Sequence, residues 1–380
     1  MFTNSPVYAI IKDRTDKRSG RALKIIHTGD IHIGSALKNL PPDKARLRQS
    51  ELTDGFRRLC DYARDNGVSC VLIAGDLFDE NNTARHIKKE ILAAIGNAKP
   101  VCFFYVSGNH DDEFACDDLP ENLYTFHKNH GWQSYDLGEN ITVTGMDTNY
   151  FSPAAFSSIA LYKERYNIVL LHGDIGAGSG REAIPLSLLK ERHIDYLALG
   201  HIHKPTLQRQ RLDGRGTYRY CGCFESRGFD EIGPRGVFLL DVQGGILQSE
   251  KFLSFATRET CEARVDISRA NTYFDIETLA LESLKNIKAE NAVKIVLCGR
   301  FKPDLRKDLG LLSRRLSSRF FALKIEDESR LFLDLSALQT DKTERGEFIK
   351  EVGRYAFTDE MREEILEVGL KALSGEEIDL

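Results

Sequence analysis

A series of short apolar runs in the first half of the chain constrains the fold most strongly. Each run is rich in β-branched or aromatic residues, and most lead directly into a glycine or a histidine. The runs are Leu23–His27, Ser69–Ala74, Val101–Val106, Ile141–Thr144, Asn167–Leu171 and Asp195–Leu199. Runs of this kind are typical of strands that are buried on both faces. Amphipathic segments at 43–66 and 83–98 separate the first three runs, with Thr83 as the expected N-cap of the second segment. This alternation predicts an α/β core with a largely parallel sheet.

The pattern changes after residue 203. Residues 206–220 contain the turn sequence Asp213-Gly214, which predicts a hairpin, and further strands are expected at 237–242 and 246–255. These segments predict a second, more antiparallel sheet.

A new unit is expected to begin between residues 256 and 263. A strand–helix–strand–helix–strand pattern follows, which predicts a small α+β domain, and two amphipathic helices end the sequence. The expected parts are an N-terminal extension at 1–22, the main α/β domain at 23–258, the α+β domain at 262–330 and a helical segment at 340–380.

Composition excludes several classes of protein. The chain has 380 residues, with 52 basic and 57 acidic side chains and a formal net charge of −5, which argues against binding polyanions by bulk charge. The longest dense apolar run, Val101–Val106, is far shorter than the roughly 20 residues that a membrane helix needs. Residues 1–20 do not resemble a secretory leader, and the eight cysteines are scattered. These features predict a reduced, cytoplasmic protein without a membrane partner.

Five short motifs follow predicted strands, at the strand ends where open α/β sheets build their sites. They are Gly29-Asp30-Ile31-His32, Gly75-Asp76-Leu77-Phe78-Asp79, Gly108-Asn109-His110-Asp111, Leu171-His172-Gly173 and Gly200-His201-Ile202-His203. Taken singly, each motif has an ordinary explanation as a turn or a capped core residue. Together they supply oxygen and nitrogen ligands that suit Mn²⁺, Fe or Zn²⁺, so we expect a metal site.

The ordered succession of these motifs resembles that of the calcineurin-like metallophosphoesterases, across residues 23–241. The resemblance implies two mixed β-sheets sandwiched between helices, with a small α+β capping domain and a helical C-terminal tail. It also implies two divalent metal ions, Mn²⁺ first, with Fe, Zn²⁺ or Mg²⁺ as alternatives. The implied ligands are Asp30, His32 and His203 for one metal, Asn109, His172 and His201 for the other, and Asp76 as the bridge between them.

The resemblance further implies that a hydroxide activated by both metals attacks the phosphorus. His110 is the candidate to stabilise the phosphoryl group or to protonate the leaving oxygen. Asp79 matches the position that orients this histidine in many members, although it could instead be a helix N-terminal acid. In the related archaeal and eukaryotic double-strand-break nucleases this position is typically a histidine.

Within the superfamily, the chain is similar to the bacterial SbcD-type DNA repair exonucleases. The similarity lies in residues 23–30, 76–79, 197–204 and 220–236. It implies DNA ends as substrate, an SbcC-like ATPase as partner and a possible homodimer. Arg227 and Lys204 are candidates to contact phosphates, although solvated surface charge explains them as well. Cys221 and Cys223 are expected to be structural thiols rather than a zinc site, because no second cysteine pair follows.

Two alternatives remain open at this stage. One is a metallophosphoesterase that acts on small phosphoesters, such as a cyclic nucleotide or a phosphomonoester. The other is a scaffold that has kept the fold and lost the chemistry, which the complete ligand set disfavours. The sequence does not distinguish exonuclease from endonuclease action, the strand polarity or the native metal.

Overall fold

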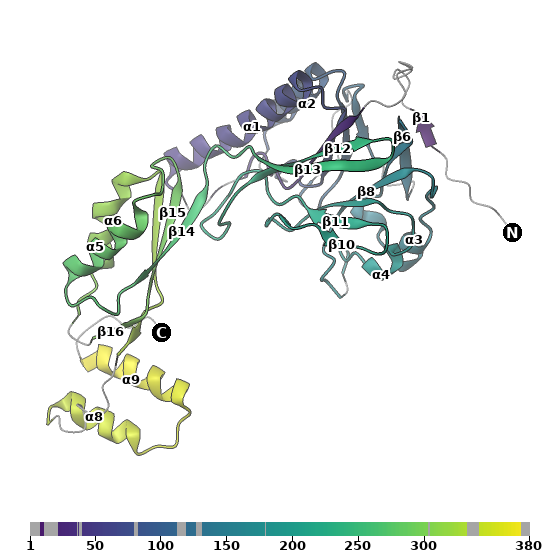
Figure 1. Cartoon of the computed structure of the whole chain (residues 1–380). Helices are drawn as coiled ribbons and strands as arrows, with labels where there is room; N and C mark the ends of the chain where they lie inside the picture. Colours follow the sequence, from purple (N-terminus) through teal and green to yellow (C-terminus); the bar gives the residue numbers. More distant parts are fainter. Residues whose placement is uncertain are drawn as a thin grey trace. The chain divides into compact units, whose positions relative to one another are not determined.

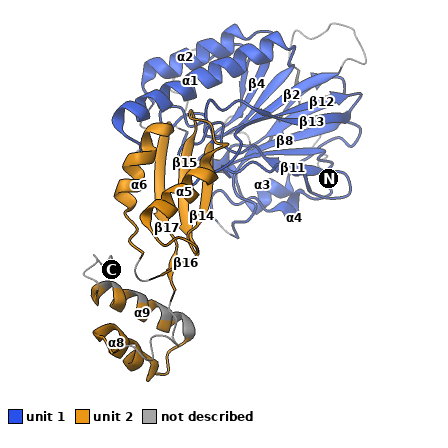
Figure 2. Ribbon diagram, turned by 60° about the vertical axis from the view of Figure 1, so that its left-hand side comes forward, with its two compact units in different colours: residues 1–259 blue, residues 260–380 orange. Residues whose placement is uncertain are grey.

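The computed structural model describes residues 8–10, 22–35, 37, 40–79, 83–111, 119–126, 131–178, 180–302, 305–332 and 342–373. The chain divides into two compact units, residues 1–259 and 260–380 (Figures 1 and 2). Most of the expected N-terminal extension lies outside the described residues, as do residues 340, 341 and 374–380 of the expected helical segment.

Unit 1 contains two β-sheets, and both are mixed. The first has the order β13 (Ile246–Ser254), β12 (Gly236–Gln243), β2 (Leu23–Thr28), β3 (Cys70–Ala74), β4 (Cys102–Val106) and β5 (Leu123–Thr125). The second has the order β1 (Tyr8–Ile10), β6 (Gln133–Gly138), β7 (Ile141–Gly145), β8 (Tyr166–His172), β9 (Tyr196–Gly200), β11 (Thr217–Tyr220) and β10 (Gln210–Arg211). The predicted arrangement of two mixed sheets is therefore confirmed.

The expectation that residues 206–255 form a sheet of their own is wrong. β12 pairs antiparallel with β2, with Phe238 opposite His27, so β12 and β13 extend the first sheet. β11 pairs parallel with β9 and carries β10 at the edge of the second sheet. The segment is split between the two sheets because its strands complete the edges of both.

The central strands β2, β3 and β4 of the first sheet are buried on both faces, as their apolar runs predicted. On one face, Ile25, Leu72 and Phe104 pack in a cluster with Ile168 and Tyr196 of the second sheet. On the other face, alternate residues pack against two helices, α1 (Pro42–Asp65) and α2 (Arg85–Asn97), which Figure 2 shows side by side. The second sheet has its own outer cluster, to which the short helices α3 (Pro153–Ser157) and α4 (Leu186–Leu189) contribute. A 3₁₀ turn, η1 (Thr148–Tyr150), precedes α3.

Thr83 is not the N-cap of α2, contrary to expectation. The cap position is Ala84, which has no side-chain cap. The Thr83 hydroxyl instead donates to the carbonyls of Ile33 (2.5 Å) and Asp79 (3.0 Å). This hydroxyl therefore holds the segment before α2 against the loops that follow β2 and β3.

Unit 2 is built on a three-stranded parallel sheet, β14 (Thr260–Asp266), β15 (Ala292–Cys298) and β17 (Ala322–Asp327). Helices α5 (Tyr273–Leu284) and α6 (Leu309–Leu316) contribute to its apolar core, and a capping box of Thr272 and Asp275 begins α5. A 3₁₀ turn, η2 (Ser317–Arg319), and a short pair, β16 (Arg300–Phe301) with β18 (Arg330–Leu331), complete this part. Helices α8 (Glu344–Gly353) and α9 (Asp359–Leu373) pack on each other through a separate cluster. No helix among the described residues is long and apolar enough to span a membrane.

A buried ionic network ties α1 to two distant segments of unit 1. Arg48 donates to Glu51 (2.6 Å), to Glu225 (3.0 Å) and to the carbonyl of Ser226 (2.6 Å). Arg258 also donates to Glu51, at 2.5 Å from its Nη2. Burial alone would raise the pKa of Glu51, but the hydrogen bonds from Arg258 and Arg48 lower it below the ordinary value of 4.5. The network therefore stabilises the fold at pH values above the ordinary glutamate pKa of 4.5. This contribution is lost as the pH falls through the lower pKa that Glu51 has in the folded state.

We expect Glu51→Ala to lower the free energy of unfolding by roughly 3–5 kcal/mol, because it removes the carboxylate that the largely buried guanidinium groups of Arg48 and Arg258 share, while Arg48 keeps its ion pair with Glu225. The measurement is urea denaturation at neutral pH. Glu90→Ala is the matched control, because Glu90 pairs with Arg57 at 2.9 Å but both side chains are about half exposed. The control substitution should lower the free energy of unfolding by less than about 1 kcal/mol. Equal losses in the two variants would contradict a stabilising role for the buried network.

Candidate metal centre

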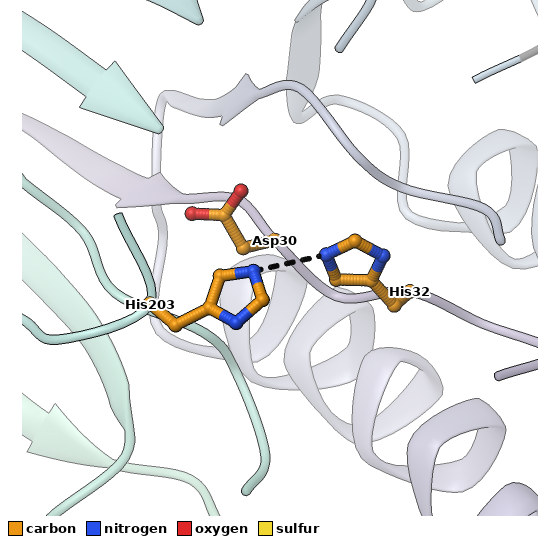
Figure 3. Close-up of side chains that lie close together, drawn as sticks. All are labelled: Asp30, His32 and His203. Carbon is orange, nitrogen blue, oxygen red and sulfur yellow. Dashed lines mark hydrogen bonds between the residues drawn. The ribbon is translucent and has the colours of Figure 1, made fainter. Parts of the chain in front are cut away.

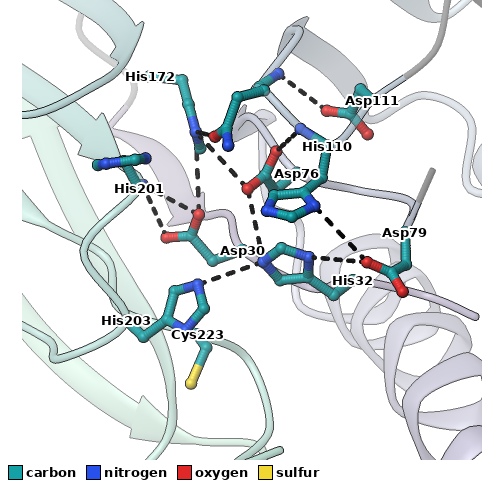
Figure 4. A network of polar contacts seen from close by, with 12 residues as sticks. Asp30, His32, Asp76, Asp79, His110, Asp111, His172, His201, His203 and Cys223 are labelled. Atoms are coloured by element: carbon teal, nitrogen blue, oxygen red, sulfur yellow. Dashed lines mark hydrogen bonds and ion pairs between the residues drawn. The ribbon is translucent and has the colours of Figure 1, made fainter. Parts of the chain in front are cut away.

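The sheet topology brings the five motifs to one place (Figure 4). Asp30, Asp76 and Asn109 follow β2, β3 and β4, which run parallel in the first sheet. His172 is the last residue of β8, and His201 follows β9, its parallel neighbour in the second sheet. His172 Nδ1 lies 2.9 Å from the carbonyl oxygen of Ala74, the last residue of β3. The carboxyl ends of both sheets therefore meet at the same site.

Backbone hydrogen bonds join the loops that carry the first two carboxylates. The amide of Asp30 donates to the carbonyl of Gly75 (3.0 Å), and the amide of His32 donates to the carbonyl of Asp76 (2.9 Å). Asp30, His32 and Asp76 have φ values of 48°, 50° and 49°. Residues with side chains rarely adopt this left-handed region, and such strain is concentrated at functional sites.

Two glycines make room for the candidate ligands. A Cβ at Gly75 would overlap with the imidazole of His172, and Gly75 itself has a φ of +82°. A Cβ at Gly108 would overlap with the carboxylate of Asp76. These motif glycines are therefore required by close approach to a ligand, in addition to the sharp turn that Gly75 makes.

Asp30, His32 and His203 form one group of donor atoms within 4.8 Å of one another (Figure 3). The Nε2 atoms of the two histidines face each other at 3.2 Å, and His32 Nε2 lies 3.5 Å from Asp76 Oδ2. Burial lowers the pKa of His32 to about 4, so this imidazole is neutral at pH 7. Neutral imidazole is the form that binds a metal.

Asp76 and His172 belong to a second such group together with Asp30, and Asn109 lies beside His172. Because the Ala74 carbonyl can only accept, His172 Nδ1 carries the proton and Nε2 has a free lone pair. Nε2 faces Asn109 Oδ1 at 2.9 Å and Asp76 Oδ2 at 3.6 Å. In this orientation three acceptors point at one another without a proton between them. A cation would satisfy all three, so the donor set fits a metal ion.

The buried carboxylates of Asp30 and Asp76 also favour a bound cation. Burial, and then the neighbouring charge of Asp76, raise the pKa of Asp30 well above its ordinary value. Backbone amides partly offset the cost: His201 N–H donates to both Asp30 oxygens (2.9 and 3.0 Å), and His110 N–H donates to Asp76 Oδ1 (2.9 Å). Two close, buried carboxylates are stable as anions when cations balance them.

His201 contributes its backbone to this site more directly than its ring. Its Nε2 lies 3.6 Å from Glu182 Oε2, and the ring centroids of His201 and His172 are 5.2 Å apart. Among the described residues, His201 does not belong to any group of His, Cys, Asp or Glu donors within 4.8 Å of one another. Its role as a metal ligand stays a prediction.

His110 and Asp79 lie beside the first group. His110 is about half exposed, and its Nδ1 is 3.8 Å from Asp79 Oδ1. The same oxygen is 3.8 Å from His32 Nδ1. Asp79 therefore lies between a candidate ligand and the candidate acid, at a distance longer than a hydrogen bond from each.

The remaining predicted residues lie around His203. Arg227 Nη2 is 3.1 Å from Nδ1 and 3.3 Å from Nε2 of His203, whereas the side chain of Lys204 is exposed. Cys221 Sγ is 3.9 Å from Asp30 Oδ2, and Cys223 Sγ is 3.5 Å from Glu231 Oε2. Burial raises the pKa of both thiols, so they are protonated donors to carboxylates at neutral pH.

Sequence reasoning did not identify two acidic residues of the site. Asp111 accepts hydrogen bonds from the amides of Phe78 and Gly108, both at 2.9 Å, and so joins the loops after β3 and β4. Glu231 Oε1 lies 2.6 Å from His203 Nδ1. Burial would raise the pKa of Glu231, but His203 and the Arg227 amide lower it to about 2. Asp111 was visible as the last residue of its motif, whereas no local spacing links Glu231 with His203.

Residues 23–205 match the family model of the calcineurin-like phosphoesterases. The chain contains a calcineurin-like metallophosphoesterase domain. Such a domain implies a metal-dependent phosphoester hydrolase, and the resemblance to the superfamily seen in the sequence is confirmed.

Three relatives illustrate the range of similar proteins. An uncharacterised metallophosphoesterase of Bacillus subtilis, YhaO, is 27% identical over 303 residues, which cover 73% of this chain and 72% of the relative. The DNA double-strand break repair protein Mre11 of Sulfolobus acidocaldarius is 24% identical, covering 70% of this chain and 72% of the relative. A component of the B. subtilis nuclease SbcCD is 30% identical over 93 residues, covering 24% of this chain and 22% of the relative.

We expect Gly75→Ala to displace His172 and to lower the free energy of unfolding by about 1–3 kcal/mol. The new Cβ would overlap with the buried ring of His172, and residue 75 has a positive φ that alanine rarely adopts. Gly178→Ala is the control, since a Cβ there meets nothing within 4 Å. Chemical denaturation measures the stability, and a crystal structure of the variant locates His172. An unmoved His172 with unchanged stability would show that the close approach at Gly75 is not required.

Proposed function

We propose that this chain is a two-metal phosphodiesterase that cleaves DNA from its ends. The observation that carries the proposal is the set of inward-facing acceptors, in which His172 Nε2, Asn109 Oδ1 and Asp76 Oδ2 converge with no proton between them. The named DNA repair relatives support DNA as the substrate, since one of them matches 70% of this chain.

The proposed ligands are the ones that the motifs predict. Asp30, His32 and His203 would hold one cation, Asn109, His172 and His201 the other, and Asp76 would contact both. Two divalent cations there, Mn²⁺ in this proposal, would supply Lewis-acid chemistry to the phosphoester and lower the pKa of an attacking water. The groups of donor atoms around Asp30 and Asp76 support this assignment.

The chain's own residues keep this donor set in a binding-competent state. The Ala74 carbonyl fixes the Nδ1–H tautomer of His172, and burial keeps His32 neutral at pH 7. The amides of His201 and His110 hold the carboxylates of Asp30 and Asp76. The site is thus preorganised by contacts that do not depend on substrate.

His110 is the proposed acid. Its half-exposed ring is reachable from solvent, and it lies next to the first donor group, with its ring centroid 5.1 Å from that of His32. In this role it donates a proton to the leaving oxygen or stabilises the phosphoryl charge, and Asp79 orients it. Arg227 and the exposed Lys204 are proposed to contact phosphates of the strand.

The wider biological role is part of the same proposal. An SbcC-like ATPase partner is proposed because one relative is a component of a nuclease of that kind. Helices α8 and α9 and the residues between them are the candidate docking segment. Tyr355 between the helices and three residues of α9 are large exposed hydrophobic residues: Met361, Val368 and Leu373. The α+β part of unit 2 is the candidate capping domain. A cytoplasmic location and a homodimer are expected on the same grounds.

The substrate is tested by incubating the purified chain and Mn²⁺ with end-labelled single- and double-stranded DNA. Bis-p-nitrophenyl phosphate, cyclic AMP and a phosphomonoester are assayed in parallel. We expect short products released from DNA ends and loss of activity in EDTA. Hydrolysis of cyclic AMP or the monoester with both DNA strands left intact would favour a small-molecule phosphoesterase. No hydrolysis of any substrate, with no Mn²⁺ bound, would indicate a non-catalytic scaffold.

We expect His110→Asn to lower the turnover number by about 10²–10⁴-fold, because the proposed proton donor is lost. Binding of Mn²⁺ should change little, since the variant keeps the backbone amide of residue 110 that donates to Asp76. Steady-state kinetics and metal analysis of the same sample measure the two quantities. Wild-type turnover in this variant would exclude His110 as the acid.

A further inference from the structure

Glu231 is a nearly buried carboxylate whose two oxygens have different partners. Oε1 lies 2.6 Å from His203 Nδ1. Oε2 accepts a hydrogen bond from the backbone amide of Arg227 at 2.6 Å and faces the thiol of Cys223 at 3.5 Å. One carboxylate therefore contacts a proposed metal ligand and the loop that carries a proposed phosphate contact.

The contact with Oε1 determines which nitrogen of His203 carries the proton. A carboxylate can only accept, so Nδ1 carries the proton and Nε2 has the lone pair. Nε2 is the atom that faces His32 Nε2 at 3.2 Å, within the first donor group. The contact with Glu231 thus directs the metal-binding nitrogen of His203 toward the other donors.

His203 needs such support more than His172 does. His172 ends strand β8, is fully buried and is fixed by the backbone carbonyl of Ala74. His203 lies on a loop outside any strand, and its side chain is about one-quarter exposed. Packing alone therefore leaves the ring of His203 freer to rotate than the ring of His172.

The loop that carries Glu231 is itself anchored to the site. The amide of Cys223 donates to the carbonyl of His203 (2.9 Å), and the hydroxyl of Ser226 donates to the carbonyl of Glu231 (2.9 Å). Elsewhere on the same loop, Glu225 is fully buried and bound to Arg48. The carboxylate of Glu231 is thus presented from a well-connected segment.

We propose that Glu231 is a positioning residue for the metal centre, which fixes His203 as an Nε2 ligand and holds Arg227 beside it. The inference rests on the proposed function, because it assumes that His203 binds a metal. A carboxylate that accepts the second N–H of a ligating histidine orients the ring and makes it a better ligand. The other oxygen of Glu231, Oε2, accepts the hydrogen bond from the Arg227 backbone amide. It thereby also fixes Arg227, whose Nη2 lies 3.1 Å from Nδ1 of His203.

The test is Mn²⁺ titration calorimetry of the full chain, without substrate. Glu231→Gln keeps the shape and removes the charge, and we expect the affinity for one Mn²⁺ to fall roughly ten- to a hundredfold. Glu121→Gln is the control, since it removes the same charge from an exposed side chain paired with Lys99, and it should bind as the wild type does. Glu231→Asp keeps the charge but shortens the reach, and its affinity should lie between those of the wild type and Glu231→Gln.

A double-mutant cycle separates positioning from general stability. In a His203→Ala background, Glu231→Gln should cause no further loss of Mn²⁺ affinity, because its target is gone. An additional tenfold loss there, or wild-type affinity in the Glu231→Gln single variant, would overturn the inference. A wild-type chain that binds no Mn²⁺ would instead overturn the proposed function itself. If Glu231→Gln does not fold, the same cycle is carried out with Glu231→Asp.

Discussion

The close burial of two carboxylates, Asp30 and Asp76, is the constraint on which the rest of the site depends. Each follows a central strand of the first sheet, and burial together with mutual repulsion raises the pKa of Asp30. The fold meets this cost with hydrogen-bond donors from elsewhere: His201 N–H comes from the second sheet and His110 N–H from the loop after β4. A single sheet would not supply both donors, which is why the site needs a sandwich with two sets of strand ends.

The close placement of Asp30 and Asp76 also explains the positive φ values at the site. Three candidate ligands on the loops after β2 and β3 have positive φ, as does His201 after β9, and each such residue costs on the order of 1–3 kcal/mol. These conformations persist because hydrogen bonds hold the loops in place. Backbone hydrogen bonds join the loops after β2 and β3, and the Asp111 carboxylate joins the loops after β3 and β4. The extensive apolar core on both faces of the first sheet offsets the strain. The geometry around Asp30 and Asp76 is thus maintained by strands β2, β3 and β4, which contain none of the candidate ligands.

The motifs could be placed from the sequence because strand ends, glycines and ligands occur next to one another along the chain. Asp30, Asp76 and His172 each adjoin an apolar run, so their convergence followed from the parallel topology. The pairing of β12 with β2 could not be predicted in the same way, since it joins residues about two hundred positions apart and hairpin spacing says nothing about which sheet an edge strand extends. Thr83 had the right residue type for an N-cap, but its hydroxyl bonds to the more distant Ile33 carbonyl. Local patterns therefore predicted the elements and the candidate ligands that the fold brings together, and long-range contacts determined the sheet edges.

Glu231 illustrates the limit most clearly. A contact between His203 and a carboxylate 28 residues later has no signature in spacing, because the intervening strands β10 and β11 belong to the second sheet. Only the folded loop brings the two together. The two histidines with a fixed Nδ1–H, His172 and His203, are held by different means, a backbone carbonyl and a side-chain carboxylate. A backbone acceptor is set by the fold and persists when side chains change, whereas a side-chain acceptor can be altered by one substitution. In the proposed metal centre, the His203 side is therefore the side at which metal affinity can be tuned without changing the fold.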